Sequence, residues 1–226
     1  MIGRIEFLVS VLVPALIVGA VTVLAKRRNA KRLPPGSYVA EGSAASQEER
    51  APGTLWSKYG GLIGHWMSDF TVFAFVIVYL LYYLVPGFDL WMYVSPYVVD
   101  LPAWVNWVGI AGLWLLQALN AMVMWYNTNF TMCTEPMKAH YVLATGGPYR
   151  LVRHPAYLSE SLSTVVVLLA TGVWFNLFGF VSWFALWVQA KAEEEALARR
   201  FGDVYVQHCQ RTGRFFPRLR KSQVTR

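Results

Sequence analysis

The chain has 226 residues, of which 56% are hydrophobic and only 15% are charged. This composition is too apolar for an ordinary soluble domain and indicates an integral membrane protein. The net charge is +7, but Lys and Arg gather in blocks beside apolar runs, which is typical of membrane topology and not of a nucleic-acid-binding surface. Cys133 and Cys209 lack metal-ligand spacing, so the sequence predicts neither a metal site nor a disulfide framework.

Three apolar runs in the N-terminal part are long enough to cross a bilayer, at residues 5–25, 67–85 and 104–125. A basic block, Lys26–Arg32, follows the first run, and the polar segment 33–58 is rich in Pro, Gly and Ser. The loop between the second and third runs contains Asp89 and Asp100 but no Lys or Arg. The positive-inside rule therefore predicts that the N-terminus lies outside and that segment 33–58 is a cytoplasmic linker.

The uncharged stretch from Ser161 to Ala190 decides the number of spans. One crossing helix needs about 20 residues and two need about 40, so this stretch is long for one helix and short for two. Both of its flanks are basic, which favours a hairpin with both ends in the cytoplasm. We predict hairpin helices at Pro155–Thr171 and Val173–Ala190, then a cytoplasmic helix over Ala192–His208. The predicted fold class is an all-α integral membrane protein with about five transmembrane helices and a cytoplasmic C-terminus.

The segment before this hairpin, Gly146–Glu160, carries a dense set of polar groups. It contains two Arg, one His, two Tyr and one Glu at a predicted membrane boundary, where such residues are costly unless they bind something. The arginines alone fit a positive-inside anchor. His154-Pro155, with Tyr157 and Glu160 on the next turn, fits an anchor less well, so we treat the segment as a candidate site.

Two sequence blocks resemble a known family. The first is Gly147-Pro148-Tyr149-Arg150-x-Val152-Arg153-His154-Pro155-x-Tyr157, and the second is Glu193-Glu194-x-x-Leu197-x-x-x-Phe201-Gly202-x-x-Tyr205. Together they resemble the isoprenylcysteine carboxyl methyltransferase-like family, whose superfamily includes membrane phospholipid methyltransferases and small-thiol methyltransferases. The resemblance covers about residues 143–217. We expect this range to be a catalytic module, preceded by a membrane region at 1–142 and followed by a basic tail at 218–226.

The resemblance implies methyl transfer from S-adenosylmethionine at the cytoplasmic membrane face, leaving S-adenosylhomocysteine. Arg153 or His154 suits the cofactor's carboxylate, and Glu193 or Glu194 suits its ammonium group or ribose. A base is needed only if the acceptor arrives protonated, and the predicted catalytic residues are His154, Glu194 and Arg153. The predicted cofactor-binding residues are Gly147, Pro148, Tyr149, Arg153, His154, Pro155, Tyr157, Glu193 and Glu194.

Three departures from the family pattern bear on the acceptor and the C-terminal segment. Gln189 stands where the carboxyl methyltransferases have an Arg that holds the substrate carboxylate, His208 replaces a Tyr, and Thr212-Gly213-Arg214 replaces Val-Pro-Arg. The loss of the Arg favours a lipophilic or small amine or thiol acceptor. The lipid bilayer and this acceptor are the predicted partners, without a nucleic acid, and the sequence does not indicate an oligomeric state.

Two other classes of protein share part of the pattern. NADPH-dependent sterol and steroid reductases of membranes carry Arg-His-Pro-x-Tyr-x-x-Glu, which Glu160 completes, but they lack the second block. A non-enzymatic scaffold that binds anionic lipid headgroups would explain the arginines but not the glutamate pair. Isoprenylcysteine-type carboxyl methylation also stays open despite Gln189.

Overall fold

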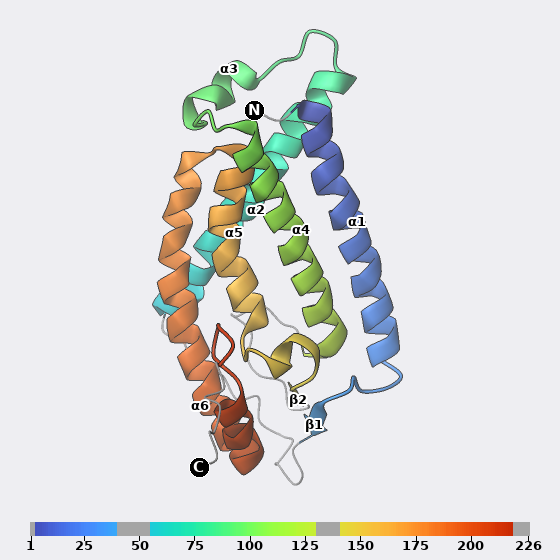
Figure 1. Cartoon of the computed structure of the whole chain (residues 1–226), viewed down its shortest axis with the longest axis vertical. Helices are drawn as coiled ribbons and strands as arrows, with labels where there is room; N and C mark the ends of the chain where they lie inside the picture. The colour runs from blue at the N-terminus through green and yellow to red at the C-terminus, as the bar shows by residue number, and fades with distance from the viewer. Residues whose placement is uncertain (1–2, 40–54, 130–140, 219–226) are drawn as a thin grey trace, which may run out of the picture.

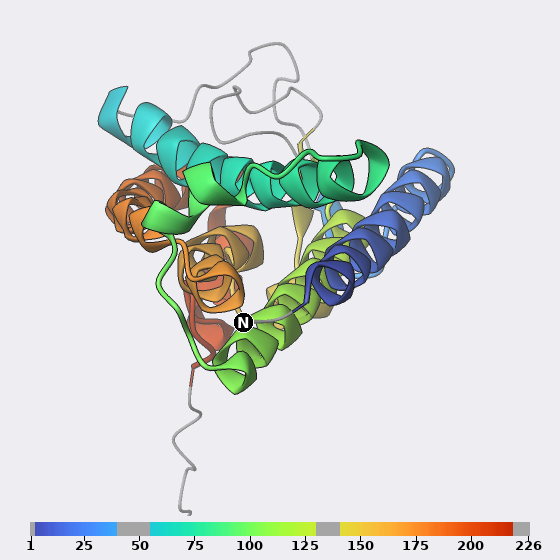
Figure 2. The same cartoon turned by 90° about the horizontal axis from the view of Figure 1, so that it is seen from above.

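The computed structural model describes residues 3–39, 55–129 and 141–218, and most of them are helical. Five long helices run along the length of this part of the molecule (Figure 1). They are α1 (Arg4–Asn29), α2 (Leu55–Leu84), α4 (Ala103–Tyr126), α5 (Pro155–Thr171) and α6 (Phe180–Arg211). Short elements connect them: α3 (Trp91–Val94), η1 (Ser95–Tyr97), η2 (Gly147–Arg150) and η3 (Trp174–Gly179). Viewed from above, α5 lies between α2, α4 and α6, and α1 packs on the outer side of α4 (Figure 2).

The helices have the apolar surfaces expected of a membrane protein. Among the described residues, α1 and α4 are long and apolar enough to cross a membrane, and Asp69–Leu84 and Pro155–Thr171 are shorter apolar helices. Large apolar side chains such as Leu16 and Leu115 are exposed on these helices, where lipid would cover them. The prediction of a helical protein with apolar spans is confirmed, and the count of about five spans stays a prediction.

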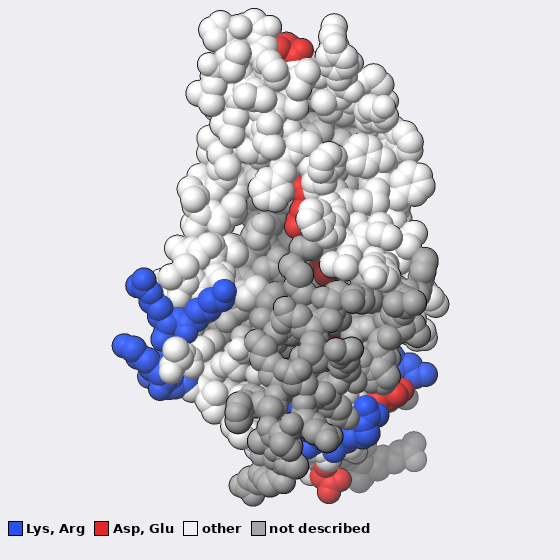
Figure 3. All heavy atoms as spheres, turned by 180° about the vertical axis from the view of Figure 1, so that it is seen from behind, with Lys and Arg blue, Asp and Glu red and all other residues white. Residues whose placement is uncertain are grey.

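The two ends of the bundle differ in charge. The N-terminus and the loop that carries α3 lie at one end, and the C-terminal part of α6 lies at the other with η2 (Figure 1). Figure 3 shows Lys and Arg gathered toward this second end on the face in view, while the opposite end is nearly free of them. Helices α5 and α6 run in opposite directions, so both basic flanks of the predicted hairpin lie at one end.

The hairpin turn lies where it was predicted, but the second hairpin helix differs. Helix α5 ends at Thr171, and Gly172 follows with a positive φ of 75°, a conformation that glycine adopts at little cost. The residues after it form η3, and α6 starts only at Phe180. The predicted break between Ala190 and Ala192 is wrong, because this stretch has no Gly or Pro to stop a helix. The helix is kinked instead at Gly202, whose φ is 51° and ψ is −130°.

A small sheet joins the linker to the candidate site. Strand β1 (Ser37–Val39) pairs antiparallel with β2 (Val142–Ala144), and Tyr38 lies opposite Leu143. The all-α prediction missed this sheet, because strands of three residues carry too little alternation to be recognised in sequence. The predicted linker and second span are also corrected: α2 begins at Leu55, ahead of the predicted start of the second span at residue 67. Residues 40–54 of the linker lie outside the described part.

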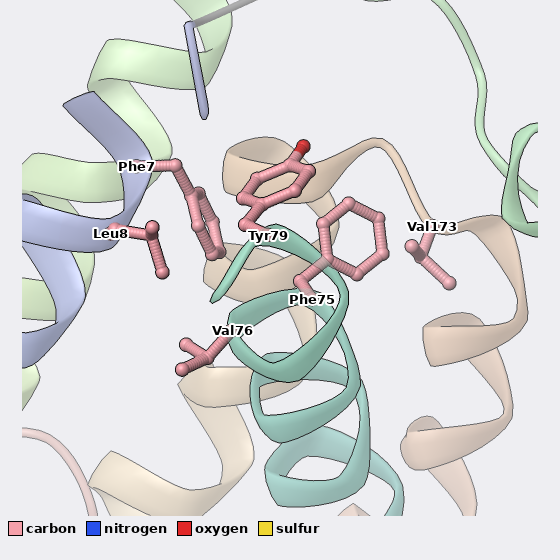
Figure 4. Close-up of a cluster of buried hydrophobic side chains, with 6 residues drawn as sticks. All are labelled: Phe7, Leu8, Phe75, Val76, Tyr79 and Val173. Carbon is pink, nitrogen blue, oxygen red and sulfur yellow. The ribbon is translucent and has the colours of Figure 1, made fainter. Parts of the chain in front are cut away.

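Two kinds of contact fix the helices in the apolar half. Near the N-terminal end, the rings of Phe7 and Tyr79 meet edge to face at 5.4 Å, and Phe75 packs beside both (Figure 4). Between α4 and α5 the backbones lie so close that a Cβ at Gly109 would collide with Ala170. Close crossings at small residues are the usual way membrane helices gain packing energy. This crossing holds α5, and with it the segment that precedes α5.

Candidate functional site

The two sequence blocks meet through the chain segment that follows α6. The Arg153 backbone N–H donates to the Gly213 carbonyl at 2.9 Å, and the His154 N–H donates to the Arg214 carbonyl at 3.1 Å. In return, Gly213 N–H donates to the Leu151 carbonyl at 3.2 Å. Pro155 occupies the first turn of α5, which leaves the residues before it extended and open to pairing. Segment 212–214 therefore holds the motif beside the C-terminal part of α6.

Glu194 is the centre of a buried ionic network. Its Oε1 accepts from Arg153 Nε at 2.8 Å and from Arg214 Nε at 3.0 Å, and its Oε2 accepts from Arg214 Nη2. Burial alone would raise the pKa of Glu194, but hydrogen bonds and positive charge from His154, Arg214 and Arg153 outweigh it and hold the pKa well below its usual range. Glu194 is therefore ionised, and it is a poor proton acceptor.

The guanidinium of Arg153 also makes its hydrogen bonds within the protein. Besides the bond to Glu194, its Nη1 donates to the Thr212 carbonyl at 2.7 Å and to the Cys209 carbonyl at 3.3 Å. These carbonyls are at the C-terminal end of α6, where a cation also interacts favourably with the helix dipole. Arg153 thus ties the motif to α6 and to the segment after it.

His154 lies between the two glutamates of the second block. Its Nδ1 is 3.4 Å from Glu193 Oε2, its Nε2 is 3.4 Å from Glu194 Oε1, and its ring stacks on Tyr157 at 5.3 Å. Burial acts to lower the pKa of His154, but the two carboxylates outweigh burial, so the pKa is raised above 6.5. Nε2 is buried and lies within ion-pair distance of Glu194 Oε1, but among the described residues it makes no hydrogen bond of good geometry. A ligand could accept a hydrogen bond from Nε2.

A cavity of about 90 Å³ opens between the motif, the end of α4 and α6. Its walls combine aromatic rings with amide, imidazole and carboxylate groups. The lining residues are Asn127, Asn129, Tyr141, Leu143, Ala144, Tyr149, Arg153, His154, Pro155, Ala156, Tyr157, Glu193, Leu197, Tyr205 and His208.

Comparison with protein-family models gives one match, to a family described as phospholipid methyltransferase, over residues 104–204. The matched segment covers 101 of the 226 residues and is similar to this family. The match confirms the resemblance to integral membrane methyltransferases that the two blocks carry. The match begins at the start of α4. It therefore includes a helix that lies outside the range of about 143–217 covered by the resemblance of the two blocks. No curated protein matches the chain.

Most of the predicted site residues line the cavity. Tyr149, Arg153, His154, Pro155, Tyr157 and Glu193 line it, whereas Gly147, Pro148 and Glu194 do not. Gly147 has a φ of 54°, and a Cβ there would collide with the ring of Tyr126, so it allows the motif to pack against α4. Pro148 is buried. Glu194 lies in the ionic network, which orients Arg153 and His154.

Several residues that line the cavity were not among the predicted site residues. Asn127 Nδ2 donates to the Tyr149 hydroxyl at 2.9 Å, and the Asn129 side chain pairs with the backbone of Val142. These asparagines follow the third apolar run, where the polar, uncharged composition was the available signal. Tyr205 belongs to the second block, and its hydroxyl is buried without a hydrogen-bond partner among the described residues.

His208 and Gln189 are the departures from the family pattern whose positions matter for chemistry. His208 lines the cavity, and burial, together with the charges of Arg153 and Arg211, lowers its pKa to about 4. Gln189 is buried on α6, one turn before Glu193, and does not line the cavity. The inference that Gln189 disfavours a carboxylate acceptor stays a prediction.

Proposed function

We propose that the chain is a membrane methyltransferase that binds S-adenosylmethionine in the cavity between the motif and α6. The observation that carries the proposal is the joining of both sequence blocks in one cavity, which is lined by His154 and Tyr157 from the first block and by Glu193 and Tyr205 from the second. A family match alone would support a methyltransferase. The cavity adds a place where a zwitterionic, aromatic ligand finds matching groups.

The chemistry of the cavity fits this cofactor. The pKa of His154 is raised above 6.5, which favours its cationic form, and its Nε2 makes no hydrogen bond of good geometry among the described residues, so it suits the amino-acid carboxylate. Glu193 suits the ammonium group or the ribose hydroxyls, and Tyr205 offers a second unpartnered polar atom. Arg153 has two of its three nitrogens bonded within the protein, so we assign the carboxylate to His154. Ligand sites usually enclose about 300 Å³ or more, so the cavity of about 90 Å³ must widen to admit the cofactor.

The bound cofactor supplies the methyl group on a sulfonium sulfur. The protein contributes mainly by aligning acceptor and methyl group, because an in-line displacement depends on position. The two glutamates raise the pKa of His154 and so favour its protonated form, which suits it to hold the cofactor and not to take a proton. His208 has the lowered pKa and is neutral at pH 7, which makes it the better proton acceptor when the methyl acceptor arrives protonated. In this proposal His208 replaces Glu194 as the base.

The acceptor is a lipophilic or small amine or thiol that is uncharged or cationic when it binds. Gln189 supplies no positive charge for a carboxylate, and a buried, unpaired charge costs several kcal/mol. The assay offers labelled cofactor with lipid amines, thiols and prenylcysteine analogues whose carboxylate is free, amidated or absent. Turnover of the free carboxylate alone, as a methyl ester, would show that the inference from Gln189 is wrong.

Cofactor binding separates this function from its two alternatives. The purified protein is titrated with S-adenosylhomocysteine and, separately, with NADPH, and binding is followed calorimetrically. A methyltransferase binds the first, a reductase binds the second, and a lipid-binding scaffold binds neither. Binding of NADPH without S-adenosylhomocysteine would overturn the proposal.

The proposed orientation places this site at the cytoplasmic face, with the N-terminus outside. Support comes from the Lys and Arg residues, which gather at the end of the bundle that carries the motif (Figure 3). Single cysteines at positions 150 and 200 are expected to react with a membrane-impermeant reagent from the same side. Labelling of the two positions from opposite sides would contradict both the hairpin and the orientation.

A further inference from the structure

A second and larger hollow lies beside the cavity, and His208 belongs to the walls of both. We call it the arginine groove. Its volume is about 890 Å³, which is within the range of about 300–1,000 Å³ usual for ligand sites. It is lined by Tyr38, Thr145, Arg150, Leu151, Val204, Gln207, His208, Gln210, Arg211, Thr212 and Arg218. These described lining residues include three arginines and no Asp or Glu.

The arginines of the groove differ from those of the ionic network. Arg153 and Arg214 share the carboxylate of Glu194. By contrast, no described residue forms a hydrogen bond or ion pair with the guanidinium of Arg150 or Arg211. One N–H of Arg218 donates to the Gln210 carbonyl at 2.8 Å. Guanidinium groups that share a hollow without a carboxylate repel one another, so a bound anion would lower their energy.

We propose that the arginine groove binds a phosphate-bearing anion, either the headgroup of an anionic lipid or a soluble phosphate. Guanidinium groups match phosphate oxygens with paired N–H donors, and the side-chain amide of Gln207 adds a neutral donor on the same walls. The groove lies at the end of the bundle where Lys and Arg gather, and anionic lipid headgroups are attracted to such an end. The exposed side chain of Leu151 on its wall suits contact with acyl chains. The inference does not depend on methyl transfer.

The test measures anion binding on the full chain without cofactor. The protein is purified in a neutral detergent and titrated calorimetrically with inorganic phosphate and with dihexanoyl phosphatidic acid, beside dihexanoyl phosphatidylcholine as a net-neutral lipid. The groove variant is Arg150→Gln with Arg211→Gln. The matched control is Lys26→Gln with Arg27→Gln, which removes the same charge from exposed positions of α1. We expect the groove variant to bind about tenfold or more weakly and the control to bind like the unchanged protein.

Each outcome decides the proposal or its source. Binding of phosphatidic acid but not inorganic phosphate, lost in the groove variant, supports a lipid headgroup. Binding of inorganic phosphate with the same loss supports a soluble ligand. The proposal is overturned if neither anion binds the unchanged chain, if the groove variant binds as tightly, or if the control loses as much. Thermal unfolding checks that the variants are folded. If the double variant does not fold, the single variant Arg150→Gln takes its place in the titrations. S-adenosylhomocysteine is absent throughout, so failure of the groove leaves the proposed function untouched.

Discussion

The two ends of the helical bundle are held together by different kinds of interaction: apolar packing at one end and ionic hydrogen bonds at the other. Near the N-terminus, rings of Phe7, Phe75 and Tyr79 pack together, and the adjoining α4–α5 crossing uses Gly109. At the end that carries the motif, Glu194 accepts hydrogen bonds from two arginines and lies beside His154, whose pKa the neighbouring carboxylates raise. Charged groups are costly within hydrocarbon, so a site built from them belongs where the bundle meets water and headgroups. We call the apolar contacts of Phe7, Phe75, Tyr79 and Gly109 the frame, because they hold the helices together. The polar end carries the residues of the candidate site.

The two ends are expected to respond differently to substitution. An apolar contact is made of many weak attractions, and the loss of one is partly compensated by relaxation of its neighbours. A buried ionic network behaves otherwise, because removing one member leaves the other charges without partners. Substitutions in the network are therefore expected to cost more than substitutions in the frame, and the predictions below test that contrast.

The largest expected effect follows from Glu194→Gln. This change leaves Arg153 and Arg214 without their shared carboxylate, and removing one partner of a buried pair typically costs about 3–5 kcal/mol of unfolding free energy. The measurement is equilibrium unfolding in detergent. Glu195→Gln is the control, because Glu195 is the exposed neighbour on the same helix and its loss should change stability by less than about 0.5 kcal/mol. Equal effects of the two changes would show that the network adds no stability.

The second effect is on cofactor affinity. His154→Ala removes the cation that we assign to the cofactor carboxylate, and loss of a charge-assisted hydrogen bond costs about 1.5–3 kcal/mol, or roughly 10–200-fold in affinity. Calorimetric titration with S-adenosylhomocysteine measures the change, with Lys191→Ala, an exposed position on α6, as the control. A folded His154→Ala protein that binds the cofactor normally would rule out this role for His154.

The same division explains which parts of the structure the sequence predicts. The apolar helices are recognisable from hydropathy alone, and Pro155 and Gly172 mark the ends of α5 because each restricts or frees a backbone angle. Both α5 bounds were predicted to the residue. The start of α2 and the unbroken passage of α6 from Ala190 into the predicted helix at Ala192–His208 were not, because a helix that leaves the membrane loses its hydropathy signal without losing its backbone hydrogen bonds.

The candidate site was predictable only where residues form recognisable blocks. The blocks supplied His154, Tyr157 and Glu193, which line the cavity. They did not separate Glu193 from Glu194, because neighbours on a helix point about 100° apart and only the packing decides which one meets Arg214. Asn129 and Arg214 were missed as site residues, since their roles depend on the pairing of Asn129 with Val142 and of segment 212–214 with the motif. Such long-range pairings leave little trace in a single sequence.

A smaller effect tests the frame. Gly109→Ala places a methyl group against the backbone of Ala170, where α4 and α5 cross, and overpacking of this kind costs about 1–3 kcal/mol. Gly19→Ala is the matched control, because a Cβ at Gly19 meets nothing within 4 Å and alanine is the better helix former. Equilibrium unfolding of both variants checks the contrast. A crossing that tolerates Gly109→Ala as well as the control would mean that close backbone contact does not hold these helices.

The smallest expected effect is the dependence of stability on pH above 6.5. The pKa of His154 is raised above 6.5 in the folded protein, so the stability from its protonated ring is fully present below pH 6.5 and is lost as the pH rises through the folded value. Glu194 adds no slope in this range, because its pKa is lowered from 4.5 and its contribution is lost only in acid. His208 has a folded pKa of about 4, so it is neutral in both states well above pH 6.5. Unfolding free energy should therefore decline as the pH rises well above 6.5 in the unchanged protein and in His208→Gln, but not in His154→Gln. A decline that persists in His154→Gln would assign the slope to another group and would remove the reason for treating His154 as the cation of the site.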